Sequence, residues 1–342
     1  MKRKMISLGL ALLTMVWVLS GCTEKKTLNR YQITLLDLFD TVTTITGYAE
    51  SEAGFEKTVR GIYTDMETYD HLYDIYHEYP DLVNLCTVNS RPGETLTVDQ
   101  RIIDLLVFAR EADEASGHRT NVTLGSVLSL WHDAREAGIS DPENAFLPPE
   151  TELRDAAEHT GFRFLEIDGT NRTVRLTDDR VKLDVGALAK GYAVQRVAET
   201  LPEGYLLSVG GNVVATGAKP DGSPWVVGVQ DPDGGGEGYL CRVNLTRGAV
   251  VTSGDYQRYY VVDGRIYHHI IDPETLYPGE KWRAVTIVCE DSGLGDALST
   301  SLFLMTREEG QALLDRYGAE AMWIQKDGTE HFSSGFRRYI KE

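Results

Sequence analysis

The sequence predicts an α+β fold: a single large compact domain with mixed or antiparallel sheets and flanking helices. Helical and strand-like patterns are interspersed without the regular β–α–β repeat of a parallel sheet. A turn signal at Asp263-Gly264 separates two apolar stretches, 259–262 and 266–271, and so indicates an antiparallel hairpin. The composition does not change after residue 31, which favours one domain over 31–342, although 342 residues would also allow two.

Each element is predicted by a local pattern. Thr, Ile, Leu and Val predominate over 32–48 with partial alternation, which is typical of strands. Apolar residues recur at helical spacing over 52–76, where we interpret the many tyrosines and histidines of 69–77 as a packed, partly exposed helix face. Thr97-Val98-Asp99-Gln100 has the pattern of a capping box, for a helix that ends near Gly117.

The remaining elements follow in chain order. We expect helices over 123–137 and 150–159 joined by a surface loop, and then a hairpin of 165–167 with 174–176. A strand over 181–184 is expected to run directly into a helix over 186–201, followed by strands over 205–209, 213–216, 225–229 and 240–245. The hairpin around 263–264, a strand over 284–289, two helices, and strands at 322–325 and near the C-terminus complete the chain.

Composition narrows the possible functions. The apolar fraction of 42% is normal for a globular protein and excludes a disordered or fibrous chain. The net charge of −18 disfavours nucleic acid as a partner, because such a surface repels phosphate backbones. Four cysteines are too few for a disulfide scaffold, and we expect Cys86, Cys241 and Cys289 to be buried apolar thiols.

The first residues have the pattern of an export signal. Three basic residues within Met1–Lys4 precede an apolar run of about 15 residues, which is short for a membrane-spanning helix of ~20. The run ends in Leu19-Ser20-Gly21-Cys22, which resembles the lipobox of a bacterial lipoprotein. We therefore predict a signal peptide over 1–21, a lipidated Cys22, a polar tether over 22–30 and an extracytoplasmic protein anchored to a bacterial membrane. An ordinary cleaved signal or a core helix is the alternative.

Two glycine-rich segments follow predicted strands, where ligands commonly meet backbone. In the segment 184–193, Asp184 ends a strand and Lys190 adds a positive charge to a helix start, whose free N–H groups favour an anion. In Val209-Gly210-Gly211-Asn212, two glycines allow backbone to approach a ligand. The alternatives are a glycine- and alanine-rich packing contact in the first segment and a plain turn in the second.

Two further segments combine polar side chains. The segment 252–258 joins hydroxyls, an aromatic residue and an arginine, and is followed by His268, His269 and Asp272. Strand alternation directs the two histidines to opposite faces, so at most one faces a site, and a structural histidine is the alternative. Asp296 and Thr300 lie at i and i+4 on one helix face, where their oxygens suit Mg²⁺; an N-cap aspartate with an unrelated threonine is the alternative.

The sequence lacks the standard signatures of several enzyme classes. It contains neither a G-x-G-x-x-G after a strand nor a Walker A motif. It also contains no H-E-x-x-H and no G-x-S-x-G. Hydride transfer on a Rossmann fold, P-loop ATP hydrolysis and triad hydrolysis are disfavoured accordingly.

Taken together, these segments resemble the FAD:protein FMN transferase (ApbE) family. The likeness rests on five ordered motifs, which are Asp-x-Gly-Ala-x-Ala-Lys-Gly-Tyr-Ala at 184–193, Gly-Gly-Asn at 210–212, Thr-Ser-Gly-x-Tyr-x-Arg at 252–258, His-Ile-Ile-Asp-Pro at 269–273 and Asp-Ala-Leu-Ser-Thr at 296–300. The first half matches more loosely, at 39–43, at Asn89 and at 121–131.

Four residues depart from the family pattern. Phe39-Asp40 replaces Met-Gly, Asn121 replaces Asp, and Leu276 stands where the family usually has Gly.

The resemblance implies an ApbE-like fold and a reaction. FAD would be cleaved with Mg²⁺, its FMN half transferred to a threonine of an extracytoplasmic electron-transport flavoprotein of the Rnf or Nqr type, and AMP released. The implied metal ligands are the Ala187 carbonyl, Asp296 and Thr300. The implied FAD-binding residues are Thr41, Asn89, Asp184, Lys190, Gly210, Gly211, Asn212, Ser253, Tyr256 and Arg258.

His269 and Asp272 are the candidate catalytic residues. A threonine hydroxyl is a poor nucleophile and needs a base, which we assign to His269. The alternative is that Asp272, or an aspartate at the metal, takes the proton. Two other functions remain open on sequence alone: a FAD pyrophosphatase that releases free FMN and AMP, and a lipoprotein that binds FAD without catalysis.

Overall fold

A computed structural model describes residues 27–234 and 238–342. The predicted signal peptide and Cys22 lie outside the described residues. The first strand, β1 (Asn29–Leu38), includes the last two residues of the predicted tether. Within the described residues, no helix combines the length and apolarity needed to cross a membrane.

The centre of the fold is an eight-stranded sheet in which neighbouring strands pair antiparallel. Its order is β1, β2 (Thr41–Ala49), β6 (Tyr205–Val209), β7 (Asn212–Ala215), β10 (Gly248–Gly254), β13 (Ala284–Cys289), β14 (Glu320–Ile324) and β15 (Glu330–Phe332). This architecture confirms the predicted α+β class.

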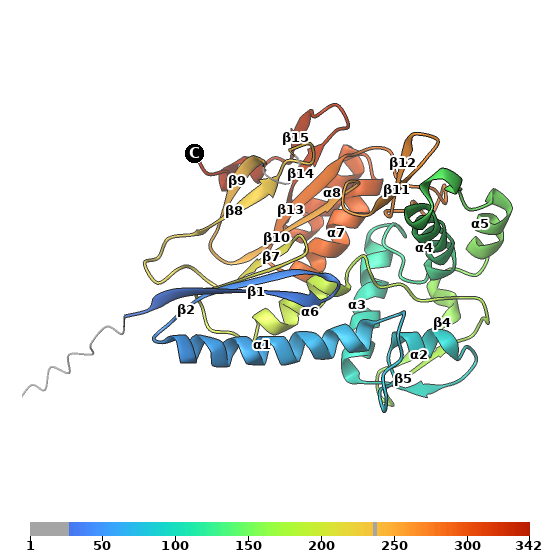
Figure 1. Ribbon diagram of the computed structural model, residues 1–342, viewed down its shortest axis with the longest axis horizontal. Coiled ribbons are helices and arrows are strands. Elements are labelled where there is room, and N and C mark those ends of the chain that lie inside the picture. Colours follow the sequence, from blue (N-terminus) through green and yellow to red (C-terminus); the bar gives the residue numbers. More distant parts are fainter. Residues whose placement is uncertain (1–26, 235–237) are drawn as a thin grey trace, which may run out of the picture.

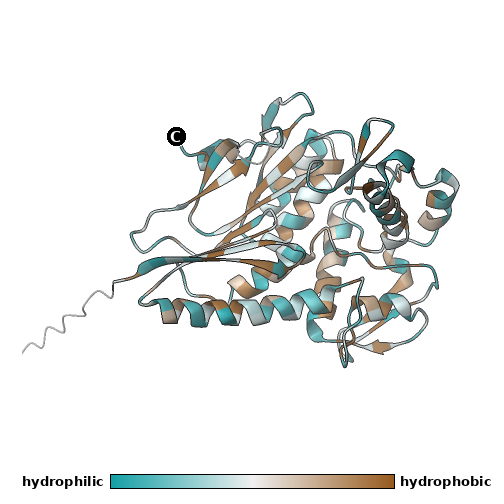
Figure 2. Ribbon diagram, in the orientation of Figure 1, coloured by the Kyte–Doolittle hydropathy of each residue, from teal (hydrophilic) through white to brown (hydrophobic). Residues whose placement is uncertain are grey.

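Each face of the sheet has its own cover (Figure 1). On one face lie the helices α1 (Glu52–Tyr73), α6 (Ala189–Ala198) and α7 (Ser292–Leu304), with α8 (Arg307–Tyr317) packed against α7. On the other face lies the hairpin of β8 (Trp225–Gln230) and β9 (Tyr239–Leu245), whose Trp225 and Val227 pack with Val250 and Val288 of the sheet. Every residue of β13 is buried because this strand is covered on both faces, and Figure 2 shows mostly hydrophobic residues there.

A second group of elements packs beside the sheet. Its helices are α2 (Leu85–Ser90), α3 (Gln100–Ala115), α4 (Gly125–Ser140) and α5 (Glu150–Ala157), with the short helices η1 (Pro142–Asn144) and η2 (Phe162–Phe164). Its strands form a small sheet of β3 (Leu96–Thr97), β5 (Thr173–Leu176) and β4 (Leu165–Asp168), and the hairpin of β11 (Tyr259–Val262) and β12 (Arg265–His268). A further short helix, η3 (Phe336–Tyr339), lies near the C-terminus. A separate apolar cluster, including Leu124, Trp131, Leu153 and Tyr260, joins α4 and α5 to the β11–β12 hairpin.

The structure corrects several predicted elements. Residues 181–184 form no strand beyond an isolated bridge at Lys182, and α6 begins only at Ala189. The backbone turns earlier because the Asp184 carboxylate accepts a hydrogen bond from the Gly186 N–H, which leaves 185–188 outside the helix. The helix α3 is capped by Asp99, not by Thr97, and β12 ends at His268, before the predicted end of that strand. Sequence patterns did not identify α2, β3 or β10.

Candidate active site

A cavity of about 970 Å³ opens where the sheet meets the second group of elements. Its lining comes from the β1–β2 turn, the end of α1, α4, the start of α6, the β6–β7 turn, the end of β10, β12 and α7. The volume lies at the upper end of the range for ligand pockets, so the cavity suits a large ligand such as a dinucleotide.

One corner of the cavity gathers the predicted metal ligands. Asp296 lies in the second turn of α7, is only 5% exposed, and accepts a hydrogen bond of 2.8 Å from the Gly191 N–H. One helical turn further on, the Thr300 hydroxyl donates to the Ala187 carbonyl at 3.5 Å. Burial raises the pKa of Asp296, while the charge of Lys190 opposes that rise. Asp296 and Thr300 thus lie one turn apart on α7, as the i, i+4 spacing predicts, and Thr300 contacts the Ala187 carbonyl that the family resemblance implies as a third ligand.

This donor set fits Mg²⁺, which prefers oxygen ligands. In the part of the chain that the structure describes, no three His, Cys, Asp or Glu side chains cluster in a way that could hold a metal. A site here would therefore use one carboxylate together with hydroxyl and carbonyl oxygens. A buried carboxylate is costly without a compensating positive charge, and a cation would supply it.

Two glycine positions make the corner possible. A Cβ at Gly191 would lie 2.3 Å from the Ser292 carbonyl oxygen and 2.6 Å from the Asp296 Cβ, so only glycine lets α6 and α7 approach this closely. A Cβ at Gly210 would lie 2.5 Å from the Thr41 hydroxyl, and this glycine also has a φ of +49°. The Gly-Gly-Asn turn therefore holds Thr41 against the site, and Asn212 of the same turn is buried in the cavity wall.

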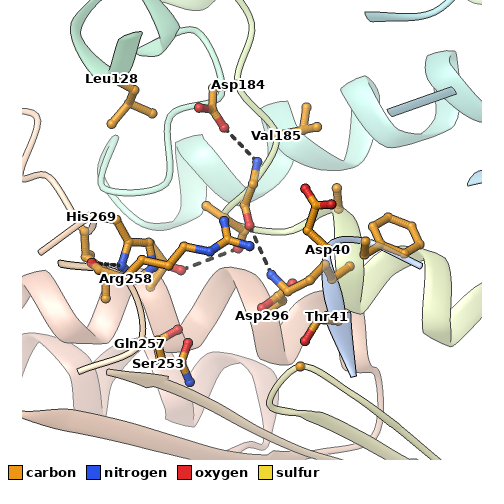
Figure 3. A pocket seen from close by; sticks show the side chains of 18 of the residues that line it. Asp40, Thr41, Leu128, Asp184, Val185, Ser253, Gln257, Arg258, His269 and Asp296 are labelled. Atoms are coloured by element: carbon orange, nitrogen blue, oxygen red, sulfur yellow. Dashed lines mark hydrogen bonds between the residues drawn. The ribbon is translucent and has the colours of Figure 1, made fainter. Parts of the chain in front are cut away.

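Positive side chains line the cavity beside this corner. Arg258 is exposed, and the Lys190 ammonium has a long 3.5 Å hydrogen bond to the Gly186 carbonyl. In the close view, Arg258 and His269 lie on one side of Asp296, and Asp40 and Thr41 lie on the other (Figure 3). Burial raises the pKa of Asp184, and the charges of Arg258 and Lys190 oppose that rise. The arrangement can hold an anion such as a pyrophosphate between its cations.

The two histidines differ in their surroundings. His268 is 6% exposed, its Nε2 lies 2.8 Å from the Gly279 carbonyl, and its Nδ1 accepts from the Ile270 N–H. His269 is half-buried, and its Nδ1 lies 3.2 Å from the Arg258 carbonyl. A carbonyl only accepts, so His269 carries its proton on Nδ1 and leaves Nε2 free to accept one. Burial, and next the charge of Arg258, lowers the pKa of His269 to about 3, while burial lowers the pKa of His268 to about 4.

The structure does not place Asp272 or Asn89 among the residues that line the cavity. The Asp272 carboxylate accepts from the Arg119 guanidinium at 2.9 Å and from the Glu274 N–H, and it is 5% exposed. Asn89 forms two hydrogen bonds with the backbone of Leu183, at 2.7 and 2.9 Å. Both residues hold backbone that leads to the site, and this geometry gives neither a direct contact with a ligand in the cavity.

Ser253 and Tyr256, which the family resemblance implies as FAD-binding residues, both line the cavity. The Ser253 hydroxyl pairs with Ser299 of α7 at 2.7 Å. The Tyr256 ring covers Gly254, where a Cβ would lie 2.3 Å from the ring. The segment 253–258 is thus held in place by contacts on both sides.

Sequence analysis missed one wall of the cavity. The helix α1 ends at Tyr73, whose ring packs with Tyr69 as predicted for a packed, partly exposed face, but His71, Asp74, Tyr76 and Tyr79 also line the cavity. Although burial raises the pKa of the Asp74 carboxyl, hydrogen bonds from the Tyr76 N–H and the Tyr79 hydroxyl lower it overall. These hydrogen bonds to the Asp74 carboxylate fix the turn that follows α1. The high frequency of tyrosine and histidine over 69–77 was the sequence signal that could have indicated a cavity wall here.

Aromatic contacts join this wall to α4. The Tyr76 ring is 56% exposed and lies 5.0 Å from the ring of His132, and the rings of His71 and Tyr79 stack at 4.0 Å. Together with Trp131, these rings offer surfaces on which a planar ligand can stack.

Comparison with known proteins identifies the family. Residues 39–323 match the sequence model of the ApbE family. The chain belongs to the ApbE family. A Treponema pallidum protein named FAD:protein FMN transferase is 32% identical over 272 residues, which cover 73% of each chain. A Klebsiella pneumoniae protein of the same name is 29% identical over 277 residues, covering 77% of this chain and 84% of its own.

Solved structures agree on the fold. The ApbE protein of Thermotoga maritima has a TM-score of 0.81 at 30% identity, covering 92% of this chain and 100% of its own. The flavin transferase ApbE from Vibrio cholerae has a TM-score of 0.75 at 22% identity, and it likewise covers 92% of this chain and 100% of its own.

Two departures from the ApbE sequence pattern fall where the backbone is left-handed. Asp40 has a φ of +50° and Leu276 a φ of +64°, and both stand at positions where the family pattern has glycine. The chain therefore keeps a backbone conformation that suits glycine while carrying a side chain, at a cost of roughly 1–2 kcal/mol per residue.

Proposed function

We propose that this protein is an Mg²⁺-dependent FAD:protein FMN transferase that joins FMN to a threonine hydroxyl of an acceptor protein and releases AMP. The observation that carries the proposal is one cavity whose lining includes Asp296, Thr300, Ala187 and His269, with the Thr300 hydroxyl bonded to the Ala187 carbonyl. The names of the relatives support the same activity.

The pyrophosphate of FAD binds between the metal corner and the cations. Lys190 and Arg258 face the cavity and attract the phosphate charge, and the preceding turn at 185–188 brings backbone close to it. Asp296, Thr300 and the Ala187 carbonyl would hold Mg²⁺, which would supply positive charge against the phosphate oxygens.

The transfer exchanges one phosphorus–oxygen bond for another. The threonine oxygen forms a bond to the phosphorus on the FMN side of FAD, and the bond from that phosphorus to the bridging oxygen breaks. The bridging oxygen leaves with AMP, and the threonine proton passes to Nε2 of His269. Because burial and the charge of Arg258 lower the pKa of His269, this nitrogen is unprotonated at neutral pH, which leaves it available to accept a proton but makes it a weak base.

The aromatic wall accommodates the rings. Tyr76, which is 56% exposed, provides a planar surface in the cavity, and either the isoalloxazine or the adenine of FAD can stack on such a surface. The lipobox ending at Cys22 supports an extracytoplasmic, membrane-anchored enzyme, which would lie close to membrane-bound acceptors of the Rnf or Nqr type.

The test is incubation of the enzyme with FAD, Mg²⁺ and the soluble apo domain of an Nqr-type flavin-bearing subunit, followed by intact mass. We expect the acceptor to gain the mass of FMN, equimolar AMP to appear, and replacement of the acceptor threonine by alanine to abolish both. Free FMN with an unmodified acceptor would instead indicate a pyrophosphatase. Intact FAD after prolonged incubation would indicate a binding protein.

A further inference from the structure

The β1–β2 hairpin forms one edge of the central sheet (Figure 1). The strand β1 is ten residues long and pairs with β2 on one side. Across residues 27–234 and 238–342, no strand pairs with its other side. An edge of this length presents a row of backbone N–H and C=O groups that can pair with an added strand, and proteins usually protect such edges with charges, prolines or a covering segment.

This edge ends at the active-site cavity. The residues of the hairpin turn, Asp37, Phe39, Asp40 and Thr41, belong to the cavity lining. Thr41 lies against the Gly210 turn, and Asp40 and Thr41 line the same cavity as Asp296 (Figure 3). A chain that pairs with β1 is therefore directed toward the metal corner.

The cavity end of the hairpin also exposes apolar side chains outside the cavity. Leu36 is 73% exposed, Val42 is 55% exposed, and Ile33, further along β1, is 37% exposed. The pairing register shifts between Leu35 and Leu38, so Leu36 lies at an irregularity of the strand. The opposite face of the hairpin is covered, since Tyr31 stacks on Phe55 of α1 at 5.5 Å.

We propose that the open edge of β1 is the docking site for the acceptor protein, which adds an extended segment to the sheet and thereby delivers its threonine to the cavity. The inference rests on the proposed function. The acceptor segment would make apolar contacts with Leu36 and Val42, and main-chain contacts along residues 29–38. Strand addition takes its affinity from backbone hydrogen bonds, and pockets for alternate side chains give it specificity.

Continuity with the cavity favours the acceptor over a second copy of this chain. Two copies that pair through β1 would form a two-fold, self-complementary contact that brings no acceptor hydroxyl to His269. An acceptor strand on the same edge would instead end at the cavity. It would bring there what the reaction needs from a partner, namely a threonine hydroxyl and its flanking backbone.

The first experiment measures transfer kinetics with Ile33→Lys and Leu36→Lys, because lysine on an edge strand opposes strand addition. Val107→Lys is the matched control, since Val107 is 42% exposed on α3 and lies outside the cavity. We expect KM for the apo acceptor domain to rise on the order of tenfold in each edge variant, with kcat within twofold and FAD affinity unchanged. Edge variants that behave like the Val107→Lys control would overturn the proposal.

The second experiment measures hydrogen exchange of the enzyme with and without the apo acceptor domain, in the absence of FAD. We expect the acceptor to protect amides within 29–38. Protection, in the enzyme alone, of those β1 amides that do not bond β2 would overturn the proposal: it would assign the edge to a second copy if it grows with enzyme concentration, and to another part of this chain if it does not. Because this readout needs no catalysis, it still tests docking if the wild-type enzyme transfers no FMN and the proposed function fails.

Discussion

The two walls of the cavity are built in different ways. The C-terminal wall comes from 184–191, 210–212, 253–258, 268–271 and 296–300, where glycines and short turns fix the backbone within contact distance of the site. The N-terminal wall comes from 37–41, 70–79 and 119–135, where polar and aromatic side chains from separate elements meet only in the folded protein. Under the proposed function, we expect the first wall to hold the reacting groups and the second to shape the space for the rings and the acceptor.

This difference explains why sequence comparison detects the walls unequally. A glycine that must admit a neighbouring helix, such as Gly191, tolerates no side chain, so the motif around it stays recognisable. A stacking surface such as Tyr76 can be supplied by several residue types at several positions. We expect substitutions in the C-terminal wall to lower kcat, and substitutions in the N-terminal wall to act mainly on affinity.

The largest effect is expected at Asp296. Asp296→Asn keeps the shape of the side chain but removes the charge that would hold Mg²⁺, so FMN transfer should fall by at least about 10³-fold. Thr300→Ser retains the hydroxyl and serves as the matched control, with activity close to wild type. Single-turnover transfer across a Mg²⁺ titration measures both. Normal turnover of Asp296→Asn at low Mg²⁺ would place the metal elsewhere.

The next effect distinguishes the adjacent histidines. His269→Ala should slow transfer by roughly 10²–10⁴-fold, the usual value of a positioned base, and should leave FAD binding intact. His268→Ala should change the transfer rate little but lower stability, since His268 is buried against Phe303. Equal loss of rate in the two variants would refute the assignment of the base.

The pH dependence sharpens this test. A free histidine with a pKa near 6.5 would lose its function as a base below that value. Since the pKa of His269 is lowered to about 3, the neutral base persists as the pH falls from 8 to 5. We expect no break in log kcat near pH 6.5. A break there in the wild type that disappears in His269→Ala would contradict the low pKa.

The sequence predicted most of the fold but left the turns around the site uncertain. Strands with strong alternation, such as β6 and β8, were identified nearly to the residue. The segment 181–188 was not, because Asp184 bonds the Gly186 N–H and Asn89 holds Leu183 from a distance of 94 residues in the chain. A side chain that far away leaves no periodic signal. The same limit hid the roles of Asn89 and Asp272, whose partners are distant in sequence.

A third effect separates positioning from catalysis. Asp272 and Arg119 form an ion pair whose side chains are 7% and 14% exposed, so Asp272→Asn removes one partner of a largely buried pair and should cost about 3 kcal/mol of folding free energy. The catalytic rate of the folded fraction should fall only a few-fold. Urea unfolding and active-site titration measure the two quantities. A rate loss as large as that of His269→Ala, with stability unchanged, would restore Asp272 as the base.

The N-terminal wall gives a smaller effect. Tyr76→Ala removes a ring that lies tilted against His132, is more than half exposed and lines the cavity. Loss of one stacking contact worth about 0.5–1.5 kcal/mol should weaken FAD binding by roughly 2- to 12-fold, with kcat nearly unchanged. Quenching of flavin fluorescence measures the affinity, and Tyr76→Phe is the control that keeps the ring. A large loss of kcat in Tyr76→Ala would remove the distinction between the walls.

The smallest effect tests the backbone at Leu276. This residue is 9% exposed, has a φ of +64°, and accepts a hydrogen bond from the Trp131 indole. Leu276→Ala and Leu276→Gly both lose the buried side chain, but only glycine also relieves the left-handed strain of roughly 1–2 kcal/mol. The glycine variant should therefore be the more stable of the two by about 1 kcal/mol.

At Leu153, a buried position in the middle of α5 and in the same apolar cluster, the order should reverse, because glycine in a helix costs about 1 kcal/mol relative to alanine. Urea unfolding of the four variants measures both differences. If Leu276→Gly were less stable than Leu276→Ala, the left-handed backbone would not be what the family glycine serves. If glycine is the more stable replacement at Leu276 and the less stable one at Leu153, the turn at Leu276 keeps a backbone conformation that suits glycine although it carries a leucine side chain.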